Sequence, residues 1–155
     1  GRKAEKPGDT EDERSTTMRH RVKITVLDTT LNEELQRRYL ANPESGVCPC
    51  FKKGDSFDFW REEDRDDFYK FGVEKPFPCA EAWDCISRYV YTGLQGGAFM
   101  HKWTNDDRVM IACCNDGTRP VIFKLERIDI PEDEADQAYL ATKDFSCSAE
   151  DAYTG

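Results

Sequence analysis

The alternation of apolar and polar positions predicts several β-strands in the central part of the chain. Val22, Ile24 and Val26 are separated by polar residues, so they lie on one face of a half-buried strand. Three further stretches have strand-like composition. The last two flank a turn-forming segment in which Gly117 can take positive φ, which favours a hairpin. The predicted strands span residues 22–28, 54–59, 109–114 and 120–128.

The spacing of apolar residues also predicts two helices between these strands. Residues 30–41 begin with Thr30 and Glu33 at the spacing of a capping box, and an apolar stripe follows. Residues 80–91 place large apolar side chains three and four positions apart. Together these elements predict an α+β domain, with a small, mostly antiparallel sheet of about four strands and two packed helices.

Charge divides the chain into three zones. Residues 1–21 have almost no apolar side chains and are expected to form a flexible arm. Residues 22–130 hold the single α+β domain, in which the acidic stretch 61–70 is expected to be a solvated loop or a short surface helix. Residues 131–155 contain seven acidic residues and one lysine, and predict an acidic tail with a short helix around 133–142.

The composition excludes several functional classes. A net charge of −9 argues against nucleic-acid binding, which needs a basic face. Two histidines cannot form a three-histidine metal centre, and the chain has neither a glycine-rich phosphate loop nor a His-Glu-x-x-His motif. The longest apolar run, residues 109–114, is far shorter than the roughly 20 residues of a membrane helix. We therefore expect neither nucleic acid nor a membrane as partner.

Seven cysteines are many for 155 residues, and the odd number leaves at least one thiol free or bound to a metal. The chain begins without the apolar segment of a secretory signal. These two observations favour a soluble cytoplasmic protein whose cysteines are mostly reduced.

Most of the cysteines occur at the ends of predicted elements. Cys48 and Cys50 flank a proline in a turn, and Cys113 and Cys114 end a strand. Cys79 opens the second helix, where the helix dipole favours a thiolate, although it also suits a simple N-cap role. Burial as small apolar side chains, thiol reactivity and metal ligation all remain open for this set, since Cys-x-Cys and Cys-Cys are not zinc knuckles.

Four other polar residues are candidates for chemistry. Arg119 can clamp a carboxylate or phosphate, or it can pair with the neighbouring Asp116. His101 is the one histidine of the central segment and can serve either as a proton shuttle or as a packed or surface residue. Asp84 can act as a base or simply stabilise the dipole at the start of its helix.

Three blocks of sequence carry a resemblance to a known family. They are Cys48-Pro-Cys-Phe51, Cys79-Ala-Glu-Ala-Trp-Asp84 and Ala112-Cys-Cys-Asn-Asp-Gly-Thr-Arg-Pro-Val-Ile-Phe-Lys-Leu-Glu-Arg127. Residues 22–129 resemble a family of small conserved proteins of bacteria and archaea, with eukaryotic relatives, to which no reaction is assigned. The resemblance implies that its motif residues form one site: Cys48, Cys79, Trp83, Asp84, Cys113, Cys114, Asp116, Gly117 and Arg119.

The preferred hypothesis is a small-molecule enzyme or binder with a pocket between the second helix and the sheet. Cys79 or Cys113 would act as a thiolate or acid–base group, Asp84 as general base, and Arg119 as the anchor of an anionic substrate group. Residues expected to bind the substrate are Trp83, Phe57, Tyr89 and His101. Cofactor-free proton transfer, of the isomerase, dehydratase or cyclase type, fits a chain without nucleotide motifs.

Two alternatives stay open. In the first, the protein is a metal module that holds zinc or iron through thiolates, drawn from Cys48, Cys50, Cys79 and either Cys113 or Cys114, with Cys114 preferred. In the second, it is an interaction domain without catalysis, whose acidic tail binds a basic partner. A homodimer is compatible with any of these hypotheses.

Overall fold

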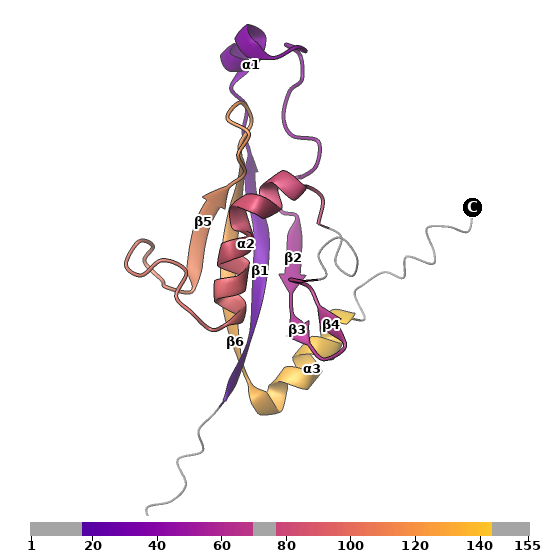
Figure 1. Cartoon of the computed structure of the whole chain (residues 1–155), viewed down its shortest axis with the longest axis vertical. Coiled ribbons are helices and arrows are strands. Elements are labelled where there is room, and N and C mark those ends of the chain that lie inside the picture. The colour runs from indigo at the N-terminus through magenta and orange to yellow at the C-terminus, as the bar shows by residue number, and fades with distance from the viewer. Residues whose placement is uncertain (1–16, 70–76, 144–155) are drawn as a thin grey trace, which may run out of the picture.

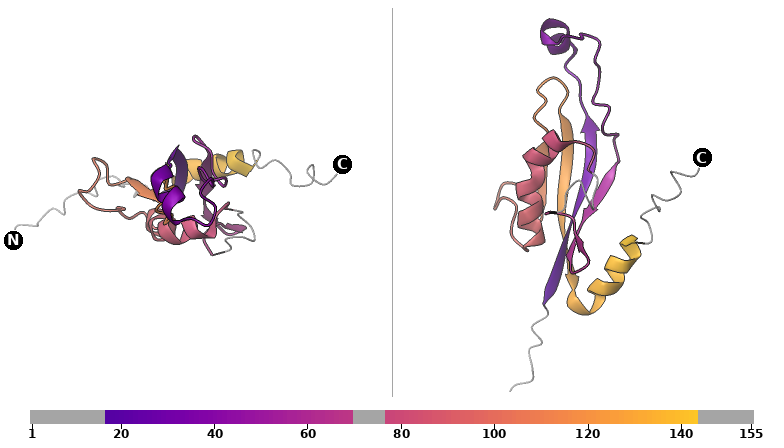
Figure 2. Two further views of the ribbon diagram at one scale, coloured as in Figure 1. Left: turned by 90° about the horizontal axis from the view of Figure 1, so that it is seen from above. Right: turned by 45° about the vertical axis from the view of Figure 1, so that its right-hand side comes forward.

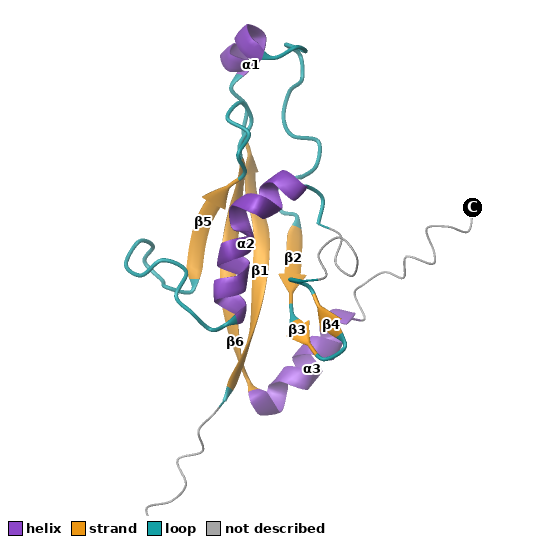
Figure 3. Cartoon of the chain, in the orientation of Figure 1, coloured by secondary structure: helices purple, strands orange, loops and turns teal. Residues whose placement is uncertain are grey.

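The computed structural model describes residues 17–69 and 77–143, and its centre is a four-stranded antiparallel sheet (Figures 1 and 3). The strands are arranged in the order β2-β1-β6-β5. The outer strands are short, whereas the two central strands form a long ribbon. The bounds are β1 Met18–Thr29, β2 Ser56–Phe59, β5 Val109–Cys113 and β6 Val121–Pro131.

The register between the two central strands explains the alternating pattern of the sequence. Ile24 is paired with Leu125, and Val26 with Phe123, so these apolar side chains gather on one face of the sheet. A β-bulge follows Val26 in β1 and shifts the register before Asp28. Pairing continues to the ends of both strands, so the β1–β6 ribbon forms the long centre of the sheet.

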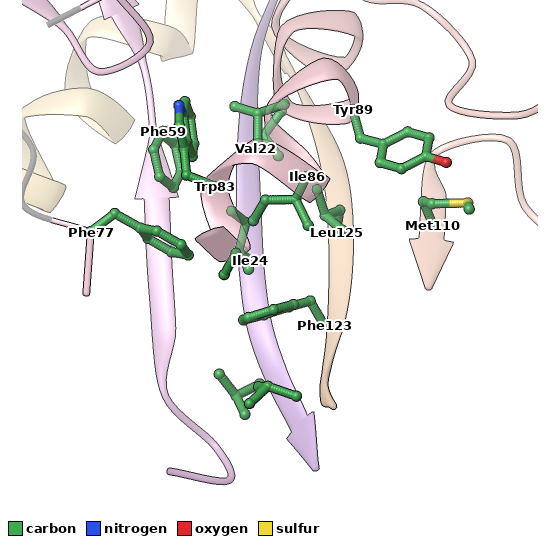
Figure 4. Close-up of a cluster of buried hydrophobic side chains, with 14 of the residues drawn as sticks. Val22, Ile24, Phe59, Phe77, Trp83, Ile86, Tyr89, Met110, Phe123 and Leu125 are labelled. Carbon is green, nitrogen blue, oxygen red and sulfur yellow. The ribbon is translucent and has the colours of Figure 1, made fainter. Parts of the chain in front are cut away.

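Helix α2 (Ala80–Leu94) covers one face of this sheet, as Figures 1 and 2 show. Its buried stripe of Trp83, Ile86 and Val90 packs against the apolar face of β1 and β6 (Figure 4). The helix approaches the sheet so closely that a Cβ at Gly93 would lie 2.5 Å from Val22 Cγ2. The main core therefore lies between α2 and the sheet.

A second, smaller cluster lies under helix α3 (Glu132–Lys143). Trp60, Ile130 and Tyr139 are buried there together, and the ring centroids of Trp60 and Tyr139 are 5.3 Å apart. The prediction of a short helix in the acidic tail agrees with α3. Residues 144–155 of that tail lie outside the described residues.

The described part of the acidic stretch 61–70 differs from the loop or surface helix that its composition suggests. Residues 61–66 form a two-stranded hairpin of β3 (Arg61–Glu62) and β4 (Arg65–Asp66), and residue 70 lies outside the described residues. The physical reason is Asp67, which is fully buried: its carboxylate accepts the backbone N–H of Trp60 at 2.8 Å and pairs with Arg65. A charged residue is buried here because it is both paired and hydrogen-bonded.

The N-cap of helix α1 (Glu33–Tyr39) lies two residues after the expected cap, Thr30. Asn32 is the N-cap, and its side chain accepts the N–H of Leu35 at 3.1 Å. Thr30, the expected cap, instead donates its hydroxyl to the carbonyl of Pro120 at 2.5 Å. The buried Gln36 then exchanges two hydrogen bonds with the backbone of Gly46, which fixes the course of the chain just before Cys48.

The predicted α+β class is confirmed, with three helices and a four-stranded antiparallel sheet in the described residues. The ordered elements extend beyond the expected domain 22–130 at both ends, because β1 begins at Met18 and α3 follows β6 directly. Residues 1–16 of the predicted arm lie outside the described residues. None of the described helices combines the length and the apolar character needed to cross a membrane.

Candidate functional site

A pocket of about 370 Å³ lies near the N-terminus of α2, at the end of the sheet nearest α1 (Figure 1). Three separate segments line it: the turn before β2, the start of α2, and the loop between β5 and β6. Four of the lining residues are cysteines. The lining residues are Cys48, Pro49, Cys50, Phe51, Cys79, Glu81, Cys114, Asn115, Asp116 and Arg119. We call this site the cysteine pocket.

Cys79 enters the pocket from the N-cap of α2. Its backbone is extended, with φ −144° and ψ 119°, and its Sγ accepts the N–H of Ala82 at 3.5 Å. The start of α2 is linked to the loop between β5 and β6, because Glu81 accepts a hydrogen bond from the Asn115 side chain at 2.6 Å. The N-cap role anticipated for Cys79 is therefore present, and it coexists with a place in the pocket.

Cys114 reaches the pocket from the loop that follows β5. Its backbone N–H donates to the carbonyl of Val121 at 3.2 Å, and its Sγ accepts the N–H of the same residue at 3.3 Å. Both bonds close the β5–β6 loop at its base. The neighbouring Cys113 does not line this pocket and is exposed on the edge strand.

Cys48 and Cys50 form the third wall together with the proline between them. The backbone N–H of Cys50 donates to Cys48 Sγ at 3.4 Å. Burial raises the pKa of the Cys50 thiol, and the negative potential of Cys48 raises it further, while Arg119 acts in the opposite direction. Of this pair, Cys48 is the one whose sulfur accepts a backbone N–H from the described residues.

Arg119 is held at the pocket by a carboxylate and a carbonyl. Its Nε donates to Asp116 at 3.0 Å, and its Nη1 donates to the carbonyl of Val47 at 3.4 Å. Hydrogen bonds from Thr118, and secondarily from Arg119, lower the pKa of the Asp116 carboxyl. The local pair expected between Arg119 and Asp116 is thus present, and it turns the guanidinium towards the Cys48 turn rather than removing it from the site.

Three of the four sulfurs in the pocket share one feature: each accepts a backbone N–H. The donors belong to Cys50, Ala82 and Val121. Backbone amides that point at sulfur suit a sulfur with negative charge, which is the nucleophilic and metal-binding form of cysteine. Within residues 17–69 and 77–143, no three metal-capable side chains are already grouped to hold an ion.

Asp84 lies apart from the cysteine pocket. It lies five positions after Cys79, which turns it to another side of α2. It lines a second, more open hollow of about 570 Å³ together with Tyr89 and Cys113. The structure therefore does not bring Asp84, Tyr89 or Cys113 together with Cys79 and Arg119.

The remaining candidates lie elsewhere. Trp83 stacks on Phe59 with ring centroids 5.2 Å apart and belongs to the core, as does Phe57, which packs edge-on against Phe77. His101 is exposed in the loop before β5, where its Nδ1 lies 2.6 Å from an oxygen of Asp107. Neither aromatic residue forms the expected pocket wall, and His101 does not line the cysteine pocket.

Three residues that line the pocket were not among the candidates predicted from the sequence: Phe51, Glu81 and Asn115. Glu81 and Asn115 are 34 positions apart and meet only because α2 lies over the sheet edge, so no local pattern could link them. Phe51 directly follows the Cys-Pro-Cys turn, and its buried ring contacts Phe123 with centroids 5.1 Å apart. The position of Phe51, a large apolar residue next to the Cys48–Cys50 turn, is the sequence feature that could have indicated its place in the pocket.

Comparison with family models, curated proteins and solved structures finds no match for this chain. The family resemblance expected from the sequence therefore stays a prediction, and function has to be inferred from the cysteine pocket itself.

Proposed function

We propose that the protein is a small-molecule binder or enzyme and that the cysteine pocket is its site. The observation that carries this proposal is the convergence of four thiols and one guanidinium from three separate segments. The volume of about 370 Å³ falls within the range of roughly 300–1,000 Å³ that is usual for ligand pockets. Convergent polar groups in such a pocket are the ordinary mark of a binding site.

Arg119 suits an anionic group on the ligand. Asp116 and Val47 fix the side chain through two of its N–H groups. Within the described residues, the other N–H groups of the guanidinium make no hydrogen bond, so they can bind a carboxylate or phosphate. Pro49 and Phe51 give the pocket an apolar wall, which favours a small organic anion with an apolar body.

The reaction that fits best is proton transfer without a cofactor. Asp84 lies in another hollow, and the two carboxylates of the pocket are engaged, Glu81 with Asn115 and Asp116 with Arg119. The thiols are therefore the candidate acid–base groups of the pocket. Cys79 is the strongest candidate because it faces the amides at the start of α2. A thiol held beside an anchored substrate can move a proton at the carbon next to a carboxylate or carbonyl, as isomerases and dehydratases require.

Anion binding is tested by alkylating the reduced protein with iodoacetate and with the neutral iodoacetamide, followed by peptide mass mapping. Arg119→Gln should lower the ratio of the two rates at the pocket cysteines about fivefold, the effect of a charge contact of about 1 kcal/mol. Arg119→Lys should retain most of the ratio. The matched control is Arg108→Gln, an exposed arginine paired with Asp106. An unchanged ratio in Arg119→Gln would reject the anion anchor.

Proton transfer is tested by incubating the protein in heavy water with a panel of small oxo and hydroxy carboxylic acids. Proton NMR then reports deuterium incorporation at carbon. We expect one acid to exchange, with exchange abolished in Cys79→Ser and retained in Cys85→Ser. If no acid of the panel exchanges, or if Cys79→Ser exchanges as fast as the native chain, the catalytic part of the proposal fails.

A thiolate metal module is the second candidate, favoured by the amide donors to three of the four sulfurs. Its ligands would be Cys48, Cys50, Cys79 and Cys114, and the metal zinc or iron. Native mass spectrometry of the reduced protein with added zinc or iron should then show one bound ion and protection of these four thiols. Full thiol reactivity in the presence of either metal would exclude this function.

A further inference from the structure

The Cys48–Pro49–Cys50 turn places two thiols in the cysteine pocket, two positions apart in the chain. Cys48 Sγ accepts the backbone N–H of Cys50 at 3.4 Å. Cys48 is half-buried against the main core, whereas Cys50 is exposed. The amide N–H that points at Cys48 Sγ favours this sulfur as the one that carries negative charge during reaction, and the exposed Cys50 lies within the same turn.

We propose that Cys48 and Cys50 form a redox-active dithiol that exchanges with small disulfides bearing a carboxylate. This activity goes beyond the proposed function, because it needs only this turn and Arg119 and no proton transfer at carbon. Cys48 is the attacking thiolate, and Cys50 is the resolving thiol.

The chain geometry permits a disulfide between these residues. Cα atoms two positions apart are separated by about 7 Å at most, in a fully extended chain, and the chain bends at Pro49 and Cys50. Disulfides need roughly 4.4–6.8 Å between Cα atoms. Since Cys48 Sγ already lies 3.4 Å from the backbone nitrogen of Cys50, bond formation requires side-chain rotation rather than a rearrangement of the fold.

Arg119 supplies the preference for an acidic disulfide. Its guanidinium bonds to the carbonyl of Val47, the residue before Cys48, and its positive charge acts on Cys50. A substrate whose carboxylate is bound by Arg119 would have its disulfide bond close to the Cys48–Pro49–Cys50 turn. The charge also favours the thiolate forms that both exchange steps use.

The exchange balances in two steps. Cys48 thiolate attacks one sulfur of the disulfide RSSR, the S–S bond breaks, and the first RS⁻ leaves and takes up a proton, which gives a mixed disulfide on Cys48. Cys50 then loses its proton and attacks the Cys48 sulfur, which releases the second RS⁻. Two electrons pass from the dithiol to the substrate: RSSR becomes two RSH, and Cys48 and Cys50 become joined.

The test uses the reduced full chain with dithiodiglycolate, an acidic disulfide, and bis-hydroxyethyl disulfide, its neutral counterpart. Mass spectrometry of the native chain should show loss of two hydrogen atoms without an adduct, and peptide mapping should place the link between Cys48 and Cys50. Cys50→Ser should instead accumulate a stable adduct on Cys48. Cys48→Ser should slow the reaction at least tenfold, while Cys85→Ser, the control, should react like the native chain.

Arg119→Gln should slow the reaction with dithiodiglycolate severalfold more than the reaction with the neutral disulfide, because only the acidic substrate also loses its carboxylate contact. Stable adducts on Cys50 or Cys79 in the native chain, or a link from Cys48 to Cys79 or Cys114, would overturn the dithiol assignment. Thiols that stay unreactive because native mass spectrometry shows a bound ion would also overturn it, in favour of the metal module. Heavy-water exchange on the same sample tests the proposed function separately, since either activity can fail while the other is observed.

Discussion

Single residues connect the strands of this protein to the end of α2, and Asp129 is the clearest case. Its carboxylate lies 2.7 Å from His20 Nδ1 and accepts two hydrogen bonds from Arg127, at 2.8 and 3.1 Å. Arg127 in turn donates to the carbonyls of Gly96 and Gly97, just beyond α2. One carboxylate thus joins β1, β6 and the chain that leaves the helix.

Asp129→Asn should destabilise the protein by about 1–2 kcal/mol at pH 7, because charge-assisted hydrogen bonds are lost. Burial alone would raise the pKa of Asp129, but the bonds from Arg127 and His20 outweigh it and lower the pKa. A lowered pKa in the folded state means that the stabilisation is complete above about pH 4 and is lost as the pH falls through the folded value. The difference in the free energy of urea unfolding between the native chain and Asp129→Asn should therefore decrease as the pH falls below about 4.

The control for this prediction is Asp106→Asn, since Asp106 pairs with Arg108 at the surface and is a site of the same chemistry. It should change the unfolding midpoint much less at neutral pH. If the loss of unfolding free energy in Asp129→Asn were the same at acidic pH as at pH 7, the effect would come from packing rather than from the charge of Asp129.

At the scale of elements, the contact between α2 and the sheet positions the cysteine pocket, because Cys79 is fixed by the helix that it caps. Gly93 is the point of closest approach: an added Cβ would lie 2.5 Å from Val22 and 2.9 Å from the Phe99 ring. Gly93→Ala should therefore push the helix away and cost about 1–3 kcal/mol, measured by thermal unfolding. Gly117→Ala is the matched control, since nothing lies within 4 Å of its added Cβ, and equal losses in both variants would contradict this packing argument.

The elements that could be predicted from sequence are those whose pattern is local. The β1 alternation and the 3.6-residue stripe of α2 are set by burial against a neighbour, so they appear in the sequence whatever that neighbour is. The same stripe contains Trp83, and its spacing with Ile86 and Val90 already pointed to the core rather than to a pocket wall. The positive φ expected at Gly117 is also absent, because the Asp116 side chain forms the turn by accepting from Thr118.

The site depends on contacts that no local pattern encodes. Cys48 reaches the pocket because Gln36 binds Gly46 ten positions away, and Cys114 reaches it because the β5–β6 loop closes on Val121. The assignment of Asp84 to the same site failed for a simpler reason, helical phase, since five residues of helix turn it away from Cys79. Local patterns therefore supply the residue types. The grouping of Cys48, Cys79, Cys114, Asp116 and Arg119 in one pocket was expected only from the family resemblance.

At the scale of the whole molecule, the cysteine pocket and the α3 cluster lie at opposite ends of the β1–β6 ribbon (Figure 1). Tyr139 joins α3 to the rest of the protein, because its ring packs on Trp60 and its hydroxyl donates to Asp64 at 2.9 Å. Tyr139→Ala should lower the free energy of unfolding by about 3 kcal/mol, whereas Leu140→Ala, at an exposed position, should have little effect.

Tyr139→Ala also tests whether the cysteine pocket forms independently of the α3 cluster. If the cysteine pocket is preformed, iodoacetate should reach Cys48 and Cys79 in the folded state, and their alkylation rates at 25 °C should be the same in Tyr139→Ala and in the native chain. Alkylation rates that rise by the same factor as the unfolding constant would show that these thiols react only when the whole molecule opens. Since small-molecule binding requires access without unfolding, that outcome would count against a ligand site in the folded protein.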